Sequence, residues 1–299
     1  MNKYYDMFRR NFPYVSREDK TINEILDNKD NIVIEKRNEQ EELIGVSIIN
    51  KNTILMLCVD EEYRNQGIGT DLLNKSEKII KENGYKEIII GVGFDYLAPG
   101  IPTSKKYYAS ENEKLYSGLN TNASNFFEKR GYKHLWDCNC FDMFLTLKDF
   151  DKTDYSTGSV IDGILYRWAT IEDLNEIIKC VNDAEDSFTE YYKNEKLYDI
   201  NNNQRVLIAI KDKEVVGTLI VSVETEANDL GCVGCTTVKH SYRGKHIGVN
   251  IVIIGTNYLK KIGLKNVNLS YTYTGMDHMY GYSGYKISCY YMMAGKKIK

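Results

Sequence analysis

Two segments of the sequence have the residue types and the spacing of an anion-binding turn. Residues 59–69 (VDEEYRNQGIG) and 238–248 (VKHSYRGKHIG) share the valine, the Tyr-Arg pair and the Ile-Gly pair in one register. Each follows an apolar, β-branched run and precedes a helical pattern, which predicts a strand, a tight turn and a helix N-terminus. Unpaired backbone N–H groups and the positive end of the helix dipole project from such a turn. Both segments are therefore expected to bind an anion, and a phosphate is the best match.

The Arg-x-x-Gly-x-Gly order resembles the coenzyme A pyrophosphate loop of the GNAT superfamily of N-acetyltransferases. The first copy matches in full, and the second keeps Arg243 and Gly248 but has His246 at the first glycine. The resemblance covers nearly the whole chain. It implies an α/β fold, with an α+β mixed sheet, arranged as two tandem acyl-CoA N-acyltransferase (GNAT) domains that use acetyl-CoA. The cofactor-binding residues that it implies are Arg64, Asn65, Gln66, Gly67, Ile68, Gly69, Thr70, Thr236, Val238, Arg243, Gly244, Lys245, His246, Ile247 and Gly248.

Acetyl transfer to an amine needs a proton donor for the leaving thiolate and an acceptor for the proton of the amine. The resemblance implies that the donor is a tyrosine four residues before the glycine of a closing Gly-aromatic pair. The second half has Tyr280 there, before Gly284, while the first half has Phe127, which cannot donate a proton. We expect catalysis in the second half, with Tyr280 as the acid and Asp277 binding or deprotonating the amine from the same helix face. The alternatives are a packing role for Tyr280 and a helix-dipole role for Asp277.

The second loop carries a β-carbon where the first has a glycine. A histidine at position 246 is strained if the backbone there needs a positive φ, and the sequence does not decide whether it does. Because Arg243 and Lys245 retain the charge, we expect the second loop to bind the coenzyme. Two other assignments stay open. One is catalysis in the first half with Tyr107 or Tyr108, and the other is a regulatory or scaffolding protein that binds coenzyme A without turnover.

Tyrosines flank the proposed acid, and carboxylates precede Tyr191 and Tyr192 in the helical pattern after Cys180. Carboxylates with aromatic faces suit a cationic, polar amine such as an amino sugar. The arrangement is similar to that of tandem acetyltransferases acting on glucosamine-type amines. Polyamines, aminoglycosides and protein amines are the other acceptors considered, and a solvated helix face with tyrosines packed on the sheet is the structural alternative. The expected substrate-binding residues are Asp186, Glu190, Tyr191 and Tyr273.

The elements that must position these residues repeat in one order along the chain. In the first half, strands over 53–59 and 87–92 flank a helix that stops at Gly84; in the second, strands over 234–238 and 267–271 flank a helix that stops at Gly263. Strands joined by a crossover helix predict a mixed sheet in each half.

The same repeat sets the expected domain boundaries. We expect an N-terminal domain over 1–150, a polar linker over 151–162 and a C-terminal domain over 163–299. The first domain has additional residues, at about 93–119, which form either a surface loop or a wall or lid of a substrate pocket.

Composition excludes several classes of protein. The net charge of −3 gives no electrostatic case for nucleic acid. No signal peptide or membrane-spanning run is present, so we expect a cytoplasmic protein that does not bind membranes, as a monomer or homodimer. Seven cysteines without framework spacing fit reduced thiols. Cys232-x-x-Cys235 has no second ligand pair, so we expect buried thiols there and no metal site.

Overall fold

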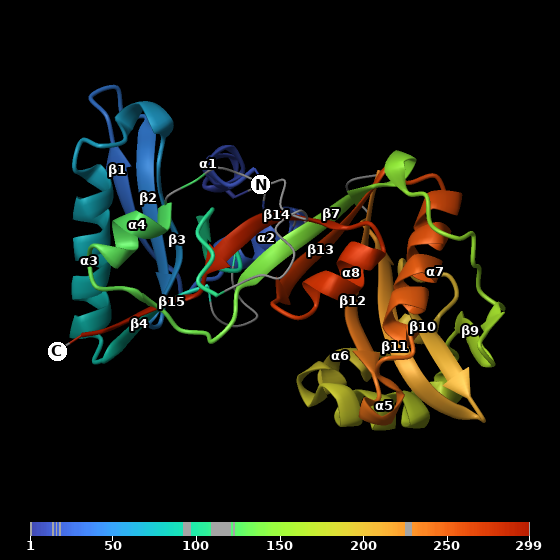
Figure 1. Cartoon of the computed structure of the whole chain (residues 1–299). Helices are drawn as coiled ribbons and strands as arrows, with labels where there is room; N and C mark the ends of the chain where they lie inside the picture. The colour runs from blue at the N-terminus through green and yellow to red at the C-terminus, as the bar shows by residue number, and fades with distance from the viewer. Residues whose placement is uncertain are drawn as a thin grey trace. The chain divides into compact units, whose positions relative to one another are not determined.

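The computed structural model describes two compact units (Figure 1). One unit contains the described residues up to 141 together with residues 288–298, and the other contains the described residues from 142 to 287. None of the described helices combines the length and the apolar character needed to cross a bilayer. The residues described are 2–13, 15, 17, 19–91, 97–108, 121, 123–224 and 229–298 of the 299 in the chain.

The described elements alternate as the sequence predicts. The helices are α1 (Tyr5–Asn11), α2 (Asp19–Leu26), α3 (Ile68–Glu82), α4 (Ala123–Glu128), α5 (Leu174–Ala184), α6 (Thr189–Tyr192), α7 (Ile247–Lys261) and α8 (Asp277–Tyr282). The first strands are β1 (Ile32–Arg37), β2 (Leu43–Asn50), β3 (Thr53–Val59), β4 (Glu87–Ile90), β5 (Ile101–Thr103), β6 (Lys133–His134), β7 (Cys140–Thr146) and β8 (Val160–Ile161). The later strands are β9 (Ile164–Trp168), β10 (Gln204–Lys211), β11 (Glu214–Val223), β12 (Leu230–Val238), β13 (Asn266–Tyr273), β14 (Lys286–Met292) and β15 (Ala294–Lys297).

The first unit contains a mixed sheet in the order β1-β2-β3-β4-β15-β6. Its neighbouring strands are antiparallel except β3 and β4, which are parallel and pair through Thr53 and Ile89. This pairing lies at the start of β3, so the two strands are open toward the turn that follows Val59. The parallel pair is therefore the place in this sheet where a ligand can reach the strand backbone.

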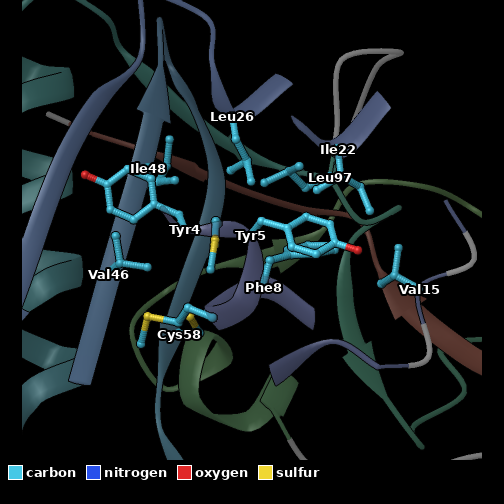
Figure 2. Close-up of a cluster of buried hydrophobic side chains, with 12 residues drawn as sticks. Tyr4, Tyr5, Phe8, Val15, Ile22, Leu26, Val46, Ile48, Cys58 and Leu97 are labelled. Carbon is cyan, nitrogen blue, oxygen red and sulfur yellow. The ribbon is translucent and has the colours of Figure 1, made fainter. Parts of the chain in front are cut away.

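Helices cover both faces of the first sheet because its strands are apolar on both sides. On one face, α1 and α2 pack on Val46, Ile48 and Cys58 in the cluster that Figure 2 shows. On the other, α3 buries Leu73 and Ile80 against the strands. The helix ends before Gly84, whose φ of 84° is the left-handed conformation expected after a helix C-terminus.

The second unit has the same plan, with strands in the order β7-β13-β12-β11-β10-β9-β8. The parallel strands β12 and β13 pair from Leu230–Asn266 to Cys232–Asn268, while β12 continues to Val238. They too are open toward the turn that follows β12. Helix α7 packs on one face, with Leu259 against Gly231, and α5 and α6 cover the other.

The units differ from the contiguous domains over 1–150 and 163–299 that the sequence predicts. Strand β15, at the end of the sequence, lies between β4 and β6 in the first sheet, and β7 lies beside β13 in the second. Each sheet thus contains a strand from the other half of the sequence. A strand pattern does not say which open edge the strand pairs with, and β15 (Ala-Gly-Lys-Lys) has no apolar pattern, so the exchange is invisible in the sequence.

The predicted linker and insertion have definite contacts where they are described. In the linker, Asn257 of α7 donates from Nδ2 to the carbonyls of Thr153 (2.8 Å) and Tyr155 (3.0 Å), which fixes this segment to the second unit. In the insertion, Asn139 Oδ1 accepts from the amides of Tyr107 (2.8 Å) and Tyr108 (3.0 Å). Residues 93–96 and 109–119 of the predicted insertion lie outside the described residues.

Candidate active site

The two predicted anion loops have the same backbone conformation. In the first loop Asn65 and Gly67 have φ of 62° and 86°, and in the second Gly244 and His246 have φ of 77° and 57°. The position of His246 therefore does take a positive φ, the point that the sequence left open. A left-handed backbone costs a non-glycine residue about 1 kcal/mol, although histidine tolerates it better than branched residues do. The second copy keeps the loop geometry in spite of the substitution.

The arginine of each loop holds the turn against the preceding strand. Arg64 Nε donates to the carbonyl of Val59 (3.0 Å), and Arg243 Nε donates to that of Val238 (3.3 Å). The Nη2 of Arg64 also reaches Asn11 Oδ1 on α1 (3.0 Å), and that of Arg243 reaches the carbonyl of the last residue of α5 (3.3 Å). Each arginine thus places positive charge at the loop while it fixes the shape of the loop.

The second glycine of the second motif, Gly248, allows a closer contact with a helix than Gly69 of the first motif does. A β-carbon on Gly248 would lie 2.5 Å from Met279 Sδ, and one on Gly69 would lie 3.6 Å from the ring of Phe126. Met279 belongs to α8 and precedes Tyr280. Gly248 therefore lets α8 approach the start of α7, which places the proposed acid beside the loop.

Tyr280 lies at the open part of the β12–β13 pair. Its hydroxyl is 2.7 Å from Thr236 Oγ1 on β12, and the side chain is 2% exposed. Burial raises the pKa of the phenol well above its ordinary value, and the hydrogen bond with Thr236 opposes part of this effect. The phenol is therefore fully protonated at neutral pH, as a proton donor must be.

The first unit has an apolar pair at the matching positions. Leu57 and Thr236 each lie twelve residues before the second glycine of their loop, and Phe127 and Tyr280 each lie four residues before the closing glycine. Phe127 is buried and Leu57 packs against the same cluster. Both members of the hydrogen-bonded pair are thus replaced together.

The first unit also contains a cavity of about 870 Å³ at its open β3–β4 pair. The loop residues Arg64, Asn65, Gly67, Gly69 and Thr70 line it, together with apolar side chains of β3 and the rings of Phe126 and Phe127. A β-carbon at Gly67 would meet no atom within 4 Å, so the loop backbone is accessible there. These residues fit a phosphorylated ligand with an apolar arm.

Two protein-family models match the chain, one for each half. The model described as "Acetyltransferase (GNAT) domain" matches residues 27–134, and the one described as "Acetyltransferase (GNAT) family" matches residues 168–282. The chain belongs to the GNAT acetyltransferase family. It contains two GNAT domains in tandem, as the repeated loop predicted, and the general reaction of the family is acetyl transfer from acetyl-CoA.

Solved structures are similar over nearly the whole of this chain, and one of them is named as a tandem GNAT protein. A tandem GNAT protein from the clavulanic acid biosynthesis pathway is 13% identical, with a TM-score of 0.66 over 98% of this chain and 93% of that one. The GCN5-related glucosamine N-acetyltransferase region of a fungal multi-domain β-N-acetylglucosaminidase is 18% identical, with a TM-score of 0.66 over 97% of this chain and 36% of that one. A GCN5-related N-acetyltransferase from Sphaerobacter thermophilus is 15% identical, with a TM-score of 0.60 over 98% of this chain and 85% of that one. At these identities the likeness shows the fold. A search of curated protein sequences finds no significant match.

Asp277 lies in the first turn of α8, three residues before Tyr280. It is 1% exposed, and its Oδ1 accepts a hydrogen bond from the amide of Gly275 (2.9 Å). This contact closes the turn that leads into α8, so the carboxylate has a structural role at the helix start. A role toward the amine stays a prediction.

The predicted substrate residues of this GNAT protein differ in exposure. Asp186, Glu190 and Tyr191 are exposed, and Glu190 pairs with Lys193 on the surface of α6. This is the geometry of a solvated helix face, the structural alternative stated above. Tyr273 is partly buried at the end of β13. Their roles in binding an acceptor stay predictions.

The cysteines of the CxxC pair lie within β12. Burial raises the pKa of the Cys232 and Cys235 thiols to about 12, so both are protonated at neutral pH. Within the part of the chain that the structure describes, no group of three or more His, Cys, Asp or Glu side chains has the arrangement of a metal site.

Two tyrosines that the sequence offered as acids of the first GNAT domain have other partners. Tyr107 donates to Glu128 (3.0 Å) and Tyr108 donates to the carbonyl of Trp136 (2.9 Å). Arg130 was not predicted as a site residue, but it lines the first cavity and donates to Thr70 Oγ1 (2.7 Å). Its position just before the closing glycine was the only available signal.

Proposed function

We propose that the protein transfers an acetyl group from acetyl-CoA to a primary amine of a small polar acceptor, and that the reaction takes place in the second domain. The observation that carries this proposal is the Thr236–Tyr280 pair beside the second loop. The first domain has Leu57 and Phe127 there, which cannot move a proton.

Each residue of the second site has a definite task in such a transfer. Acetyl-CoA, when bound, supplies a thioester, and the loop of residues 243–248 with the backbone of Thr236 and Val238 would hold it. The amine nitrogen forms a bond to the acetyl carbon as the carbon–sulfur bond breaks. Tyr280 gives its phenolic proton to the leaving sulfur, and Asp277, directly or through water, takes the proton that the amine loses. Solvent then returns a proton to Tyr280 and takes one from Asp277, so the transferred protons balance.

The first domain supports a second role, which is binding coenzyme A without transfer. Its cavity of about 870 Å³ reaches a loop with a complete Arg-x-x-Gly-x-Gly motif, and Arg130 adds positive charge beside Thr70. A bound coenzyme would stabilise this domain by mass action, since any ligand that binds only the folded state does so. This role can accompany catalysis in the second domain or replace it in a regulatory protein.

The acceptor that we would test first is an amino sugar such as glucosamine. The support is a fold similar to that of a region named as a glucosamine N-acetyltransferase, together with the tyrosines and carboxylates of the second domain. Polyamines, aminoglycosides and lysine peptides are the other acceptors to compare. A cytoplasmic location and a monomeric or homodimeric state belong to the same proposal.

Thiol release with a panel of these amines tests the function. Arg64→Glu and Arg243→Glu are compared with the wild type, and calorimetry measures coenzyme A binding to each. We expect Arg243→Glu to abolish release and Arg64→Glu to remove one binding event while release persists. Binding without release for every amine would overturn the enzyme and favour the regulatory role. Release that depends on Arg64 alone would move the reaction to the first domain.

A further inference from the structure

Strand β12 has a bulge next to the proposed acid. Between the pairs Thr218–Thr237 and Ile220–Gly234, β11 advances by two residues while β12 advances by three. The extra residue falls at Cys235 and Thr236, and Cys235 has a left-handed φ of 48°. A bulge changes the direction of the side chains that follow it, so this one decides where Thr236 points.

A chain of buried hydroxyl groups holds the bulge. Tyr192 Oη donates to the carbonyl of Cys235 (2.5 Å), and Thr218 Oγ1 donates to Tyr192 Oη (2.7 Å). Thr218 has only one hydroxyl proton, so Thr237 must donate in the 2.6 Å contact between the two threonines. These three side chains are at most 2% exposed. The hydrogen bonds therefore run from Thr237 through Thr218 and Tyr192 to the backbone carbonyl of Cys235 in the bulge.

The first domain lacks this chain at the same place in its sheet. There the cross-strand pair next to the glycine–valine pair is Val46–Cys58, where the second domain has Thr218–Thr237. Figure 2 shows Val46 and Cys58 inside an apolar cluster. Met56 matches Cys235 and is not among the described residues with positive φ. The hydroxyl chain, the left-handed residue and the tyrosine acid thus occur together in one domain and are replaced together in the other.

We propose that Tyr192 is a positioning residue for acetyl transfer, and this rests on the function proposed above. By fixing the carbonyl of Cys235, it fixes the peptide that joins Cys235 to Thr236. In a trans peptide the direction of the carbonyl sets that of the following N–H group. Thr236 is thereby held with its hydroxyl on the phenol of Tyr280. Tyr192 acts on the reaction through the strand, not by touching a substrate.

The test uses the full-length protein, acetyl-CoA and the best amine of the panel. Tyr192→Phe removes the donor to the bulge, and Thr218→Val breaks the chain one step earlier with little change of volume. Thr218→Ser keeps the hydroxyl and should restore the wild-type rate. Tyr166→Phe is the matched control, because Tyr166 is a fully buried tyrosine of the same domain whose hydroxyl accepts from Asn250 Nδ2 (3.5 Å).

We expect Tyr192→Phe to lower kcat about 10- to 100-fold, the loss that a misplacement of about 1 Å produces. The KM for acetyl-CoA and the calorimetric affinity for coenzyme A should stay near the wild-type values. Hydrogen exchange of the peptide 230–238 should become faster in Tyr192→Phe and not in Tyr166→Phe. A merely structural role would give equal losses of kcat in both variants.

The proposal is overturned if Tyr192→Phe keeps the wild-type kcat, or if Thr218→Ser fails to restore activity lost in Thr218→Val. Should the wild type release no thiol with any amine, the proposed function fails first, and a positioning role in that reaction fails with it. Exchange at residues 230–238 would still show whether Tyr192 fixes the bulge.

Discussion

Replacing Tyr280 by phenylalanine separates the proposed chemistry from the packing of the same side chain. The variant keeps the ring, whose centroid is 5.9 Å from that of Tyr285 in an edge-to-face contact. It removes only the hydroxyl that lies 2.7 Å from Thr236 Oγ1. The first domain already carries a phenylalanine at this position, so the fold accepts the substitution.

Two effects of different size are expected. Loss of a proton donor should lower kcat by about 10²- to 10⁴-fold, which corresponds to about 3–5 kcal/mol of transition-state stabilisation. Loss of the hydrogen bond leaves the buried Thr236 hydroxyl without this partner and should cost about 1–3 kcal/mol of unfolding free energy. A domain that remains folded at 25 °C is thus expected, with a large defect in rate.

Thiol release gives kcat, calorimetry gives the affinity for coenzyme A, and urea unfolding gives the stability. The decisive variant is Tyr280→Phe combined with Thr236→Val. Removing both partners of a buried hydrogen bond is nearly neutral when the shapes are kept, so the double variant should recover most of the lost stability. Its rate should not recover.

The role of Tyr280 as proton donor fails if Tyr280→Phe retains kcat within a few-fold of the wild type. It also fails if the double variant regains activity together with stability, since the defect would then come from the unpaired hydroxyl. A loss of coenzyme affinity that matches the loss of rate would place Tyr280 in binding and not in proton transfer.

Three further outcomes follow from the geometry. Burial lowers the pKa of His134, so the unfolded chain binds the proton before the folded one does as the pH falls. Stability should therefore be lost below about pH 6.5, and the slope of unfolding free energy against pH should be smaller in His134→Gln. Gly69→Ala should leave stability unchanged or raise it by about 0.5–1 kcal/mol. Gly248→Ala should be about 1–3 kcal/mol less stable than Gly69→Ala and should release thiol more slowly, because its new β-carbon meets Met279 at 2.5 Å. Ending the chain at Met292 removes the strand between β4 and β6, so hydrogen exchange should show lost protection in the first sheet; unchanged exchange there would contradict the strand exchange.

The sequence predicted the features of the fold that depend on local pattern. The strand, Arg/Gly turn and helix recur at both predicted places, and α3 ends before Gly84 as expected. The exchanged strands could not be predicted, because β15 (Ala-Gly-Lys-Lys) has no strand pattern of its own and the partners of β7 and β15 lie far away in the chain. The conformation of His246 was also hidden, since most residues that accept a positive φ also occur without one.

The site residues that belong to a sequence motif were predicted. Those whose role depends on which side of a short helix they face were not. Tyr280 and the loop glycines were named from their spacing. Tyr191 and Tyr192 are neighbours on a helix of one turn, yet the first is 41% exposed and the second fully buried. Successive residues of a helix point about 100° apart, and four residues are too few for periodicity to show which one faces the sheet.

The hydroxyl groups of the second domain are interdependent, and this favours a functional reading over a packing one. A buried hydroxyl is costly unless it is paired, so Thr218, Thr237, Tyr192, Thr236 and Tyr280 are stable only while their partners are present. Apolar side chains at the matching positions fill the two faces of a sheet without that constraint, as in the first domain. They are Val46 and Cys58 on one face, and Leu57 and Phe127 on the other. The fold can be built either way, yet the costlier hydroxyl groups occur only in the domain with the tyrosine acid. A single apolar substitution there should therefore destabilise the protein more than joint replacement of Thr218, Thr237 and Tyr192. Each of these variants, single or joint, should slow acetyl transfer.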